Sequence, residues 1–255
     1  MAEPGLEELV SALRVAGCVF AEEEAKILVG SATNPAELVE MLRRRVAGEP
    51  LEHVVGWVWF CGRRIAVGPG VFVPRRRTEF LVACAAALHP PALLDLCCGS
   101  GAIGLSVPGV TELHAADVDA AAVECAARNL VAVGGTVHRG DLFDALPSEL
   151  HRRFDAIVVN APYVPTGEIE LMPREARIHE PNVALDGGTD GAGLHRRVAA
   201  QALQWLAPNG SVLIETSAQL VGSTLQAFLE AGLAAVVRTS ETLDAVVVIG
   251  SAAEQ

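Results

Sequence analysis

The residues of this sequence best suited to chemistry are Asn160, Ala161, Pro162 and Tyr163, which directly follow the apolar run 154–159. The side-chain oxygen of Asn160 and the backbone carbonyl of Ala161 are both acceptors, so together they can hold both hydrogens of a planar –NH₂ group. The lone pair of that nitrogen then points out of the plane, toward an electrophile bound beside it. Asn also stabilises turns, and Tyr163 could stack on the target or fill a gap. We favour the interpretation that these four residues are catalytic.

Upstream, residues 93–101 (LLDLCCGSG) are suited to binding such an electrophile. Gly99 and Gly101 remove side chains where a ligand must approach the backbone. Asp117, at the end of the second expected strand, can accept both hydroxyls of a ribose, and Asp141, at the end of the third, can accept from an adenine amino group. Ligands of parallel sheets lie at the carboxyl ends of the strands, so these positions predict one composite site for S-adenosylmethionine (AdoMet). The predicted cofactor-binding residues are Asp95, Cys97, Gly99, Ser100, Gly101, Asp117, Val118, Asp141, Leu142 and Asn160.

Several of these positions also have a purely structural interpretation. Asp117 lies where a helix N-cap occurs, although Asp119 is better placed for that role, and Asp141 could simply stabilise a turn. A Gly-rich turn is also compatible with a dinucleotide site, but the spacing G-x-G-x-x-G would need a glycine at Cys97. The loop 186–191 (DGGTDG) is explained adequately by helix N-capping through its Asp or Thr.

The composition restricts the class of protein. Of 255 residues, 31 are acidic and 19 basic, giving a net charge of −12. This charge argues against a nucleic-acid partner, which requires a basic face. Of the two arginine clusters, 43–45 and 75–77, we interpret the first as a solvated helix end. No apolar stretch is long enough to span a bilayer, and residues 1–17 lack the basic start of a signal peptide, so we expect a cytoplasmic protein. Six cysteines show no C-x-x-C pair and no metal spacing with histidine, so we expect reduced thiols and no metal.

Strands and helices alternate from residue 92 onward, which predicts an α/β fold with a parallel sheet. The expected strands are 92–97, 112–118, 136–141, 154–160, 210–216, 234–239 and 245–250, and the expected helices are 120–133, 194–206 and 219–231. We expect the last two strands, joined by a short link, to pair antiparallel at the sheet edge. Apolar residues at helical spacing predict short amphipathic helices within 5–47, and residues 57–67 predict a hairpin. The expected units are an N-terminal helical domain (1–50), a hairpin linker (51–72) and a cofactor domain (73–255).

These motifs resemble those of the protein-glutamine methyltransferases, the family that includes the release-factor and ribosomal-protein enzymes. The resemblance covers nearly everything from residue 48 to residue 250. It implies a seven-stranded Rossmann-like class I AdoMet-dependent methyltransferase with a small N-terminal helical domain and a connecting hairpin. It also implies AdoMet as cofactor, and as substrate the side-chain amide of a protein glutamine, best matched by the Gly-Gly-Gln of a release factor. The matching segments are 48–51 with Gly56, 73–75, 78–79, 95–101, Asp117 with Asn129, 140–143, 160–163, 180–181, 184–185, 187–188 and 190–191.

The sequence also departs from the family pattern. The signature Asn-Pro-Pro-Tyr has Ala161 at its second position, and Cys97-Cys98 replaces the Gly-Thr of the release-factor enzymes. We therefore interpret the chain as a divergent paralogue whose partner is a release factor or a ribosomal protein. Three alternatives stay open: methylation of the exocyclic amine of adenine in nucleic acid, methylation of a small molecule, and AdoMet binding without catalysis.

Overall fold

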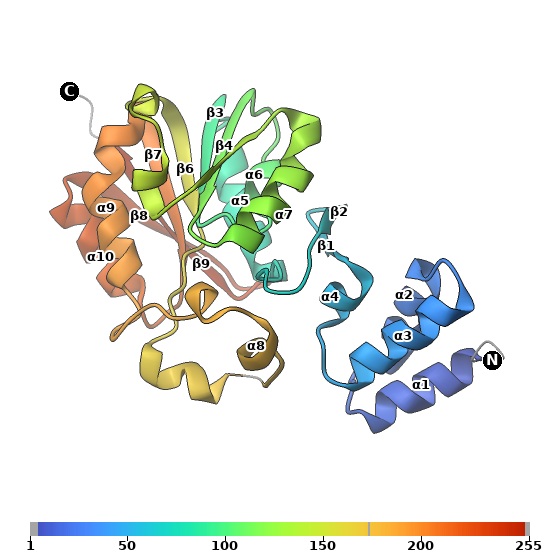
Figure 1. The fold of residues 1–255 in the computed structure, drawn as a ribbon. Helices are drawn as coiled ribbons and strands as arrows, with labels where there is room; N and C mark the ends of the chain where they lie inside the picture. The colour runs from blue at the N-terminus through green and yellow to red at the C-terminus, as the bar shows by residue number, and fades with distance from the viewer. Residues whose placement is uncertain (1–4, 173, 253–255) are drawn as a thin grey trace.

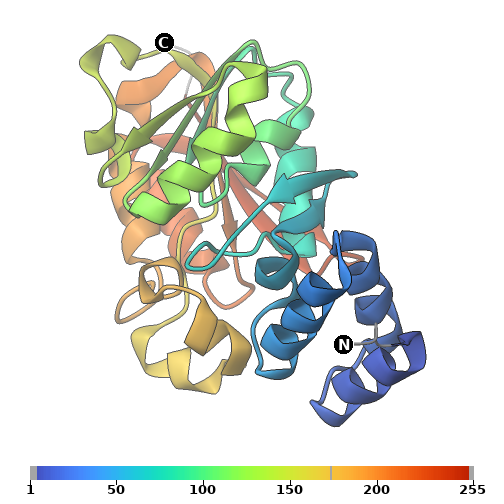
Figure 2. The same cartoon turned by 45° about the vertical axis from the view of Figure 1, so that its right-hand side comes forward.

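The structure is a computed structural model that describes residues 5–172 and 174–252. Its first part is a small helical unit made of α1 (Leu6–Val15), α2 (Ala21–Ser31), α3 (Pro35–Val46) and the short α4 (Leu51–Val55). Leu9, Leu13 and Leu28 are fully buried in a core of their own, to which Val54 of α4 also contributes. Figures 1 and 2 both show these four helices outside the layers that cover the main sheet.

The start of α3 follows the sequence-based expectation. Asn34 is the N-cap, and its side-chain oxygen accepts a hydrogen bond from the Glu37 N–H at 3.0 Å. Pro35 occupies the first helical position, where its missing N–H has no partner to lose.

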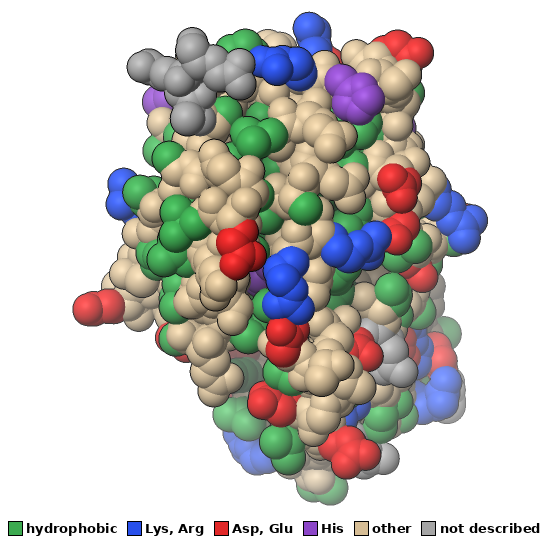
Figure 3. Space-filling view, turned by 90° about the vertical axis from the view of Figure 1, so that its left-hand side faces the viewer, with side chains coloured by type: hydrophobic (Ala, Val, Ile, Leu, Met, Phe, Trp, Pro, Cys, Tyr) green, Lys and Arg blue, Asp and Glu red, His purple; other side chains and the backbone are tan. Residues whose placement is uncertain are grey.

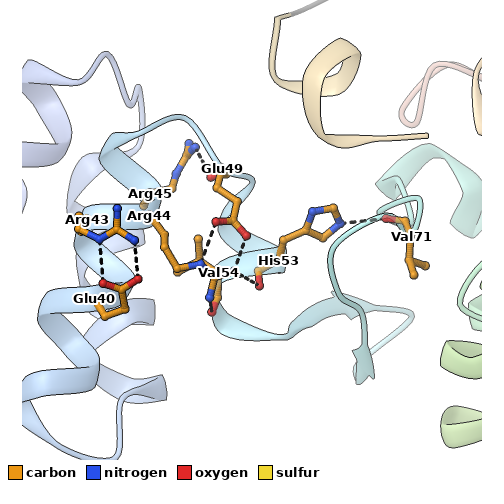
Figure 4. A network of polar contacts seen from close by, with 8 residues as sticks. All are labelled: Glu40, Arg43, Arg44, Arg45, Glu49, His53, Val54 and Val71. Atoms are coloured by element: carbon orange, nitrogen blue, oxygen red, sulfur yellow. Dashed lines mark hydrogen bonds and ion pairs between the residues drawn. The ribbon is translucent and has the colours of Figure 1, made fainter. Parts of the chain in front are cut away.

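The last turn of α3 corrects, for Arg44 and Arg45, the interpretation of residues 43–45 as a solvated helix end. Each arginine is ion-paired with a glutamate, and the side chains of Arg44 and Arg45 are only 29% and 11% exposed. Figure 4 shows Arg44 directed toward Glu49 in the connection to α4. Arg44 and Arg45 therefore join α3 to the connection before α4 and to Glu24 of α2, whereas Arg43 pairs with Glu40 of its own helix and is 69% exposed.

A two-stranded hairpin connects the helical unit to the rest of the chain, as expected. Strands β1 (Trp57–Phe60) and β2 (Arg63–Ala66) pair antiparallel, with Trp57 opposite Ala66. The segment that follows the hairpin leads to α5 (Glu79–Ala86) and then into the sheet.

The sheet has seven strands in the order β5-β4-β3-β6-β7-β9-β8. The first five in this order are parallel, and β9 lies antiparallel between β7 and β8. The strands are β3 (Ala92–Leu96), β4 (Glu112–Asp117), β5 (Thr136–Arg139), β6 (Phe154–Val159), β7 (Leu206–Thr216), β8 (Leu233–Ser240) and β9 (Ala245–Ala252). All seven expected strands are present, the closing antiparallel pair is confirmed, and β7 begins four residues earlier than the expected start at 210.

Helices cover both faces of the sheet (Figure 1). Successive side chains of a strand point to opposite faces of the sheet. Leu93 of β3 therefore joins the core beneath α5, α6 (Ala102–Ser106) and α7 (Ala120–Leu130). Leu94 joins the core on the other face, beneath α9 (Gly193–Trp205) and α10 (Val221–Glu230). Every residue of β3 is buried. Within the described ranges, none of the helices is both long and apolar enough to cross a membrane.

Candidate active site

A cavity of about 740 Å³ lies where the carboxyl ends of β3, β4 and β6 meet. The turn 97–100, Asp117 with Val118, Asp141 with Leu142, and residues 160–163 all line it. The tertiary structure thus brings the predicted cofactor and target residues to one space, with Asp95 and Gly101 as the two that do not line it. A volume of this size is within the usual range for small-molecule sites.

The turn after β3 is shaped for close approach of a ligand. Its backbone has positive φ at Cys97 (59°), Gly99 (54°) and Gly101 (74°), a conformation that glycine adopts without steric cost. A Cβ on Gly101 would lie 3.2 Å from the side chain of Leu130, so α7 leaves little room for any larger residue. The Ser100 hydroxyl is buried in this turn and has no hydrogen-bond partner among the described residues.

Asp117 holds this turn in place from the neighbouring strand. Its two carboxylate oxygens accept hydrogen bonds from the N–H groups of Gly99 (2.9 Å) and Asp119 (3.0 Å). A carboxylate oxygen can accept more than one hydrogen bond, so both retain capacity for the two hydroxyls of a ribose. Burial raises the pKa of Asp117. Asp119 is the N-cap of α7, as expected, and accepts from Ala121 and Ala122.

Asp95 lies below the cavity. Its side chain is fully buried, one oxygen accepts from the Gly104 N–H of α6 at 2.8 Å, and the other has no hydrogen-bond partner among the described residues. Burial raises the pKa of Asp95 to about 8. The hydrogen bond of the Asp95 side chain is therefore with α6, the helix that follows the Gly-rich turn.

The cavity is also lined by Arg197, a residue that the sequence did not reveal. Asp141 forms an ion pair with Arg197 of α9, with 2.7 Å between the two groups. Leu142, beside Asp141, has a positive φ of 50°. Val118 also lines the cavity, and its side chain, 48% exposed, offers an apolar surface for a planar ring. Arg197 lies 56 residues after Asp141, and no local pattern in the sequence marks it.

Elsewhere on the cavity wall, Asn160 is oriented by a residue from the segment before α5. The Asn160 side-chain nitrogen donates to the Thr78 hydroxyl at 3.4 Å. Thr78 therefore does not occupy the side-chain oxygen of Asn160. Thr78 is 2% exposed. Beside it, Arg77 pairs with the buried Glu215 of β7 at 3.3 Å and lies over the ring of Tyr163. Burial raises the pKa values of Glu215 and Tyr163. The sequence places Thr78 only within the segment 78–79 that resembles the family, and it gives no sign of the contact made by Glu215.

Helix capping explains the loop 186–191 only in part. The N-cap of α9 is Ala192, which makes no side-chain cap, but Asp190 accepts from the Ala192 N–H at 3.1 Å and pairs with Arg196 of α9. A Cβ on Gly187 would lie 2.6 Å from the Tyr163 Cα, and one on Gly191 would lie 2.5 Å from the Tyr163 carbonyl oxygen. The Gly187 N–H donates to the Val164 carbonyl at 2.8 Å. The glycines are therefore needed because the loop packs directly on the backbone that follows Asn160.

A mostly parallel seven-stranded sheet that closes with an antiparallel pair, and that carries its Gly-rich turn after the first strand of the sheet domain, is the architecture of class I AdoMet-dependent methyltransferases. The residues of the cavity fit that cofactor: Asp117 suits the ribose, and the Gly-rich turn with the unpaired Ser100 hydroxyl suits close polar contact.

Residues 63–191 match the Methyltransferase small domain family. The chain is 34% identical to the release factor glutamine methyltransferase of Geobacter sulfurreducens over 78% of this chain and 72% of that protein. It is 38% identical to the enzyme of the same name from Streptomyces coelicolor, over 69% of this chain and 66% of that protein. It is also 34% identical to the 4-amino-L-phenylalanine/4-methylamino-L-phenylalanine methyltransferase of Streptomyces pristinaespiralis, over 78% of this chain and 71% of that protein. The chain belongs to the release factor glutamine methyltransferase family and is an AdoMet-dependent methyltransferase.

Solved structures support the fold. A methyltransferase from Pyrococcus furiosus superimposes with a TM-score of 0.56 at 14% identity, covering 85% of this chain and 96% of that one. The 16S rRNA N2 G1207 methyltransferase of T. thermophilus, in complex with AdoMet and guanosine, superimposes with a TM-score of 0.54 at 22% identity. The match covers 77% of this chain and 50% of that one.

Proposed function

We propose that this enzyme methylates the side-chain amide nitrogen of a glutamine in a protein, and that the substrate is a Gly-Gly-Gln segment of a translation release factor or a related glutamine of a ribosomal protein. The observation that carries the proposal is the position of Asn160 and Ala161 on the wall of the same cavity as the cofactor residues. Relatives named release factor glutamine methyltransferase, with 31–38% identity, support this choice of substrate.

The proposed chemistry depends on position and electrostatics. An amide nitrogen is a weak nucleophile because its lone pair is delocalised. Asn160 Oδ1 and the Ala161 carbonyl would accept hydrogen bonds from the two N–H groups of the target nitrogen. They would hold that nitrogen with its lone pair facing the cofactor. AdoMet, when bound, supplies an electrophilic sulfonium methyl group. The N–H groups become more acidic as the nitrogen gains positive charge, so both acceptors bind the transition state more tightly than the ground state. A proton then leaves to water.

The two arginine–glutamate pairs beside this end of the cavity would fix the surroundings of the target. Arg75 pairs with Glu180 and Arg77 with Glu215, and in each pair the glutamate side chain is 2% exposed. We propose that Tyr163, held by Arg77 and by the glycine loop, packs against the target amide. Pro162 stiffens the chain between these residues.

A small aromatic amine is the second candidate substrate. The relative named 4-amino-L-phenylalanine/4-methylamino-L-phenylalanine methyltransferase is as similar to this chain as the first release-factor relative. The same two acceptors would hold an aryl –NH₂ group. A nucleic-acid substrate has less support, because acidic and basic side chains are interspersed on the face beside α9 and α10 (Figure 3) and the net charge is −12.

The experiment is single-turnover methyl transfer from labelled AdoMet to three acceptors: a Gly-Gly-Gln peptide, an intact release factor and 4-aminophenylalanine. We expect transfer to the release factor. Asn160→Ala should reduce the rate by about 10²–10³, by analogy with the loss of one preorganised oxyanion donor, with little change in AdoMet affinity. Ala161→Pro is the matched control, because it keeps the carbonyl acceptor and should retain activity. Equal rates for wild type and Asn160→Ala would refute the role of Asn160, transfer to 4-aminophenylalanine alone would select the second candidate, and no transfer to any acceptor would favour binding without catalysis.

A further inference from the structure

Asn129 of α7 connects the hairpin to the cofactor turn. Its side-chain oxygen accepts from the Ala66 N–H at 3.0 Å, and its amide nitrogen donates to the Ala66 carbonyl at 2.9 Å and to the Ser100 carbonyl at 2.8 Å. One amide thus satisfies both backbone groups of the last residue of β2 and one carbonyl of the turn that lines the cavity. An alanine at this position would lose all three contacts.

The hairpin in turn contacts the helical unit. Ala66 lies opposite Trp57 in the β1–β2 register, and the Trp57 indole N–H donates to the hydroxyl of Ser31, the last residue of α2, at 3.3 Å. Hydrogen bonds therefore join Ser100, Asn129 and Ala66, and a further one joins Trp57 to Ser31. Between Ala66 and Trp57 the link is the pairing of β1 with β2, which the bond from the Val67 N–H to the Gly56 carbonyl (3.1 Å) holds together next to them.

A second connection reaches the cavity wall through α4. Figure 4 shows the ring of His53 directed toward Val71, and its Nε2 lies 2.9 Å from the Val71 carbonyl. A carbonyl only accepts, so Nε2 carries the proton in this contact. Gly70 and Phe72, on either side of Val71, both line the cavity. The helical unit is thus joined both to the turn and to the segment 70–72, whose Gly70 and Phe72 line the same cavity.

We propose that Asn129 couples occupancy of the cofactor cavity to the order of the hairpin and, through Trp57 and Ser31, to the helical unit. A ligand that fixes the turn lowers the cost of ordering the hairpin, and a hairpin held by a bound partner lowers the cost of ordering the turn. Such coupling is reciprocal by thermodynamic linkage, so a partner that binds the helical unit would tighten cofactor binding by the same factor. This inference depends on AdoMet use and not on which nitrogen is methylated.

Hydrogen exchange with and without saturating S-adenosylhomocysteine tests the proposal. In the wild type we expect the ligand to slow exchange in the turn 97–101 and the adjoining α6, in β2 and in α2. Asn129→Ala should keep the protection of the turn but lose it in β2 and α2, and the Kd for S-adenosylhomocysteine should rise by about two- to tenfold, the range of one net hydrogen bond. Ser31→Ala should lose only the protection of α2.

Glu124→Ala is the matched control, because Glu124 is an exposed residue of the same helix. It should reproduce the wild-type pattern in all three segments. Should Asn129→Ala fail to fold, Asn129→Asp replaces it: this variant keeps the acceptor for Ala66 and removes both donated bonds. Ligand-induced protection of β2 and α2 that is absent in the wild type, or that is equal in the wild type and the Asn129 variant, would overturn the proposal. Methyl-transfer activity does not enter either readout, so a failure here is separate from a failure of the proposed substrate.

Discussion

Replacing Asp95 by asparagine should change how the stability of this protein depends on pH. Asp95 is fully buried, and its folded-state pKa is raised from 3.8 to about 8 because burial disfavours the charged carboxylate. Between these two values the unfolded chain has lost a proton that the folded protein keeps. The free energy of unfolding therefore falls as pH rises from about 4 to about 8, and this contribution is constant above that range.

The size of the effect follows from the shift. Each pH unit within the window costs about 1.4 kcal/mol, so Asp95 should lower wild-type stability by about 4 kcal/mol between pH 5 and pH 8. Asp95→Asn keeps an oxygen for the Gly104 N–H but cannot ionise, so this contribution to the slope should vanish. In the variant, an amide –NH₂ group replaces the Asp95 oxygen that has no hydrogen-bond partner, and it also lacks a partner. We therefore expect the variant to lose about 1–3 kcal/mol of its free energy of unfolding at every pH.

Urea unfolding of both proteins at one-unit intervals from pH 5 to pH 9 measures the slopes. Glu215, whose pKa is also raised by burial, is present in both proteins and cancels in the difference. Asp117, whose pKa is raised as well, is also present in both, and its charge contributes to the raised pKa of Asp95, so that part belongs to the Asp95 slope. Glu149→Gln, on an exposed turn, is the control and should follow the wild-type curve. Parallel curves for wild type and Asp95→Asn would refute the reasoning. The affinity for S-adenosylhomocysteine, measured alongside, should change little if Asp95 acts only by supporting α6.

Three further predictions concern the cavity. Asp117→Ala should weaken AdoMet binding by roughly 1.5–3 kcal/mol for each charge-assisted ribose bond lost; calorimetry giving an unchanged Kd for the folded variant would remove Asp117 from the site. Thr78→Val should lower kcat with unchanged AdoMet affinity, because the amide of Asn160 loses the acceptor that orients it. Thr78→Ser keeps a hydroxyl and should retain the wild-type rate, so equal kcat values for the Val and Ser variants would contradict this role of Thr78. Gly187→Ala should destabilise the protein by about 1–3 kcal/mol through overpacking, because its Cβ would lie 2.6 Å from the Tyr163 Cα; an unchanged thermal unfolding midpoint would show that the loop is free to move.

Much of the fold was predictable because it depends on local patterns. Alternation of apolar strands with helices predicted the seven strands of the sheet, and Asn34-Pro35 marked the start of α3. The Gly-rich turn and Asn160 were found because each directly follows an apolar strand, and strand ends meet in a parallel sheet. The roles assigned to these residues stay predictions, as does the division of the chain into three domains.

The class of fold, the cofactor and the motif at residues 160–163 were predictable from residue types within a few positions of one another. Which distant residues complete the cavity depends on how the chain packs. Thr78 lies 82 residues from Asn160, and Arg197 lies 56 residues from Asp141, so no local spacing predicts either contact. The tertiary structure also decided that Asp95 supports α6, that the glycines of residues 186–191 pack on Tyr163, and that Asn129 joins two units. The physical reason is that burial and hydrogen bonding between segments depend on how the chain packs, whereas propensity and periodicity are properties of the segment alone.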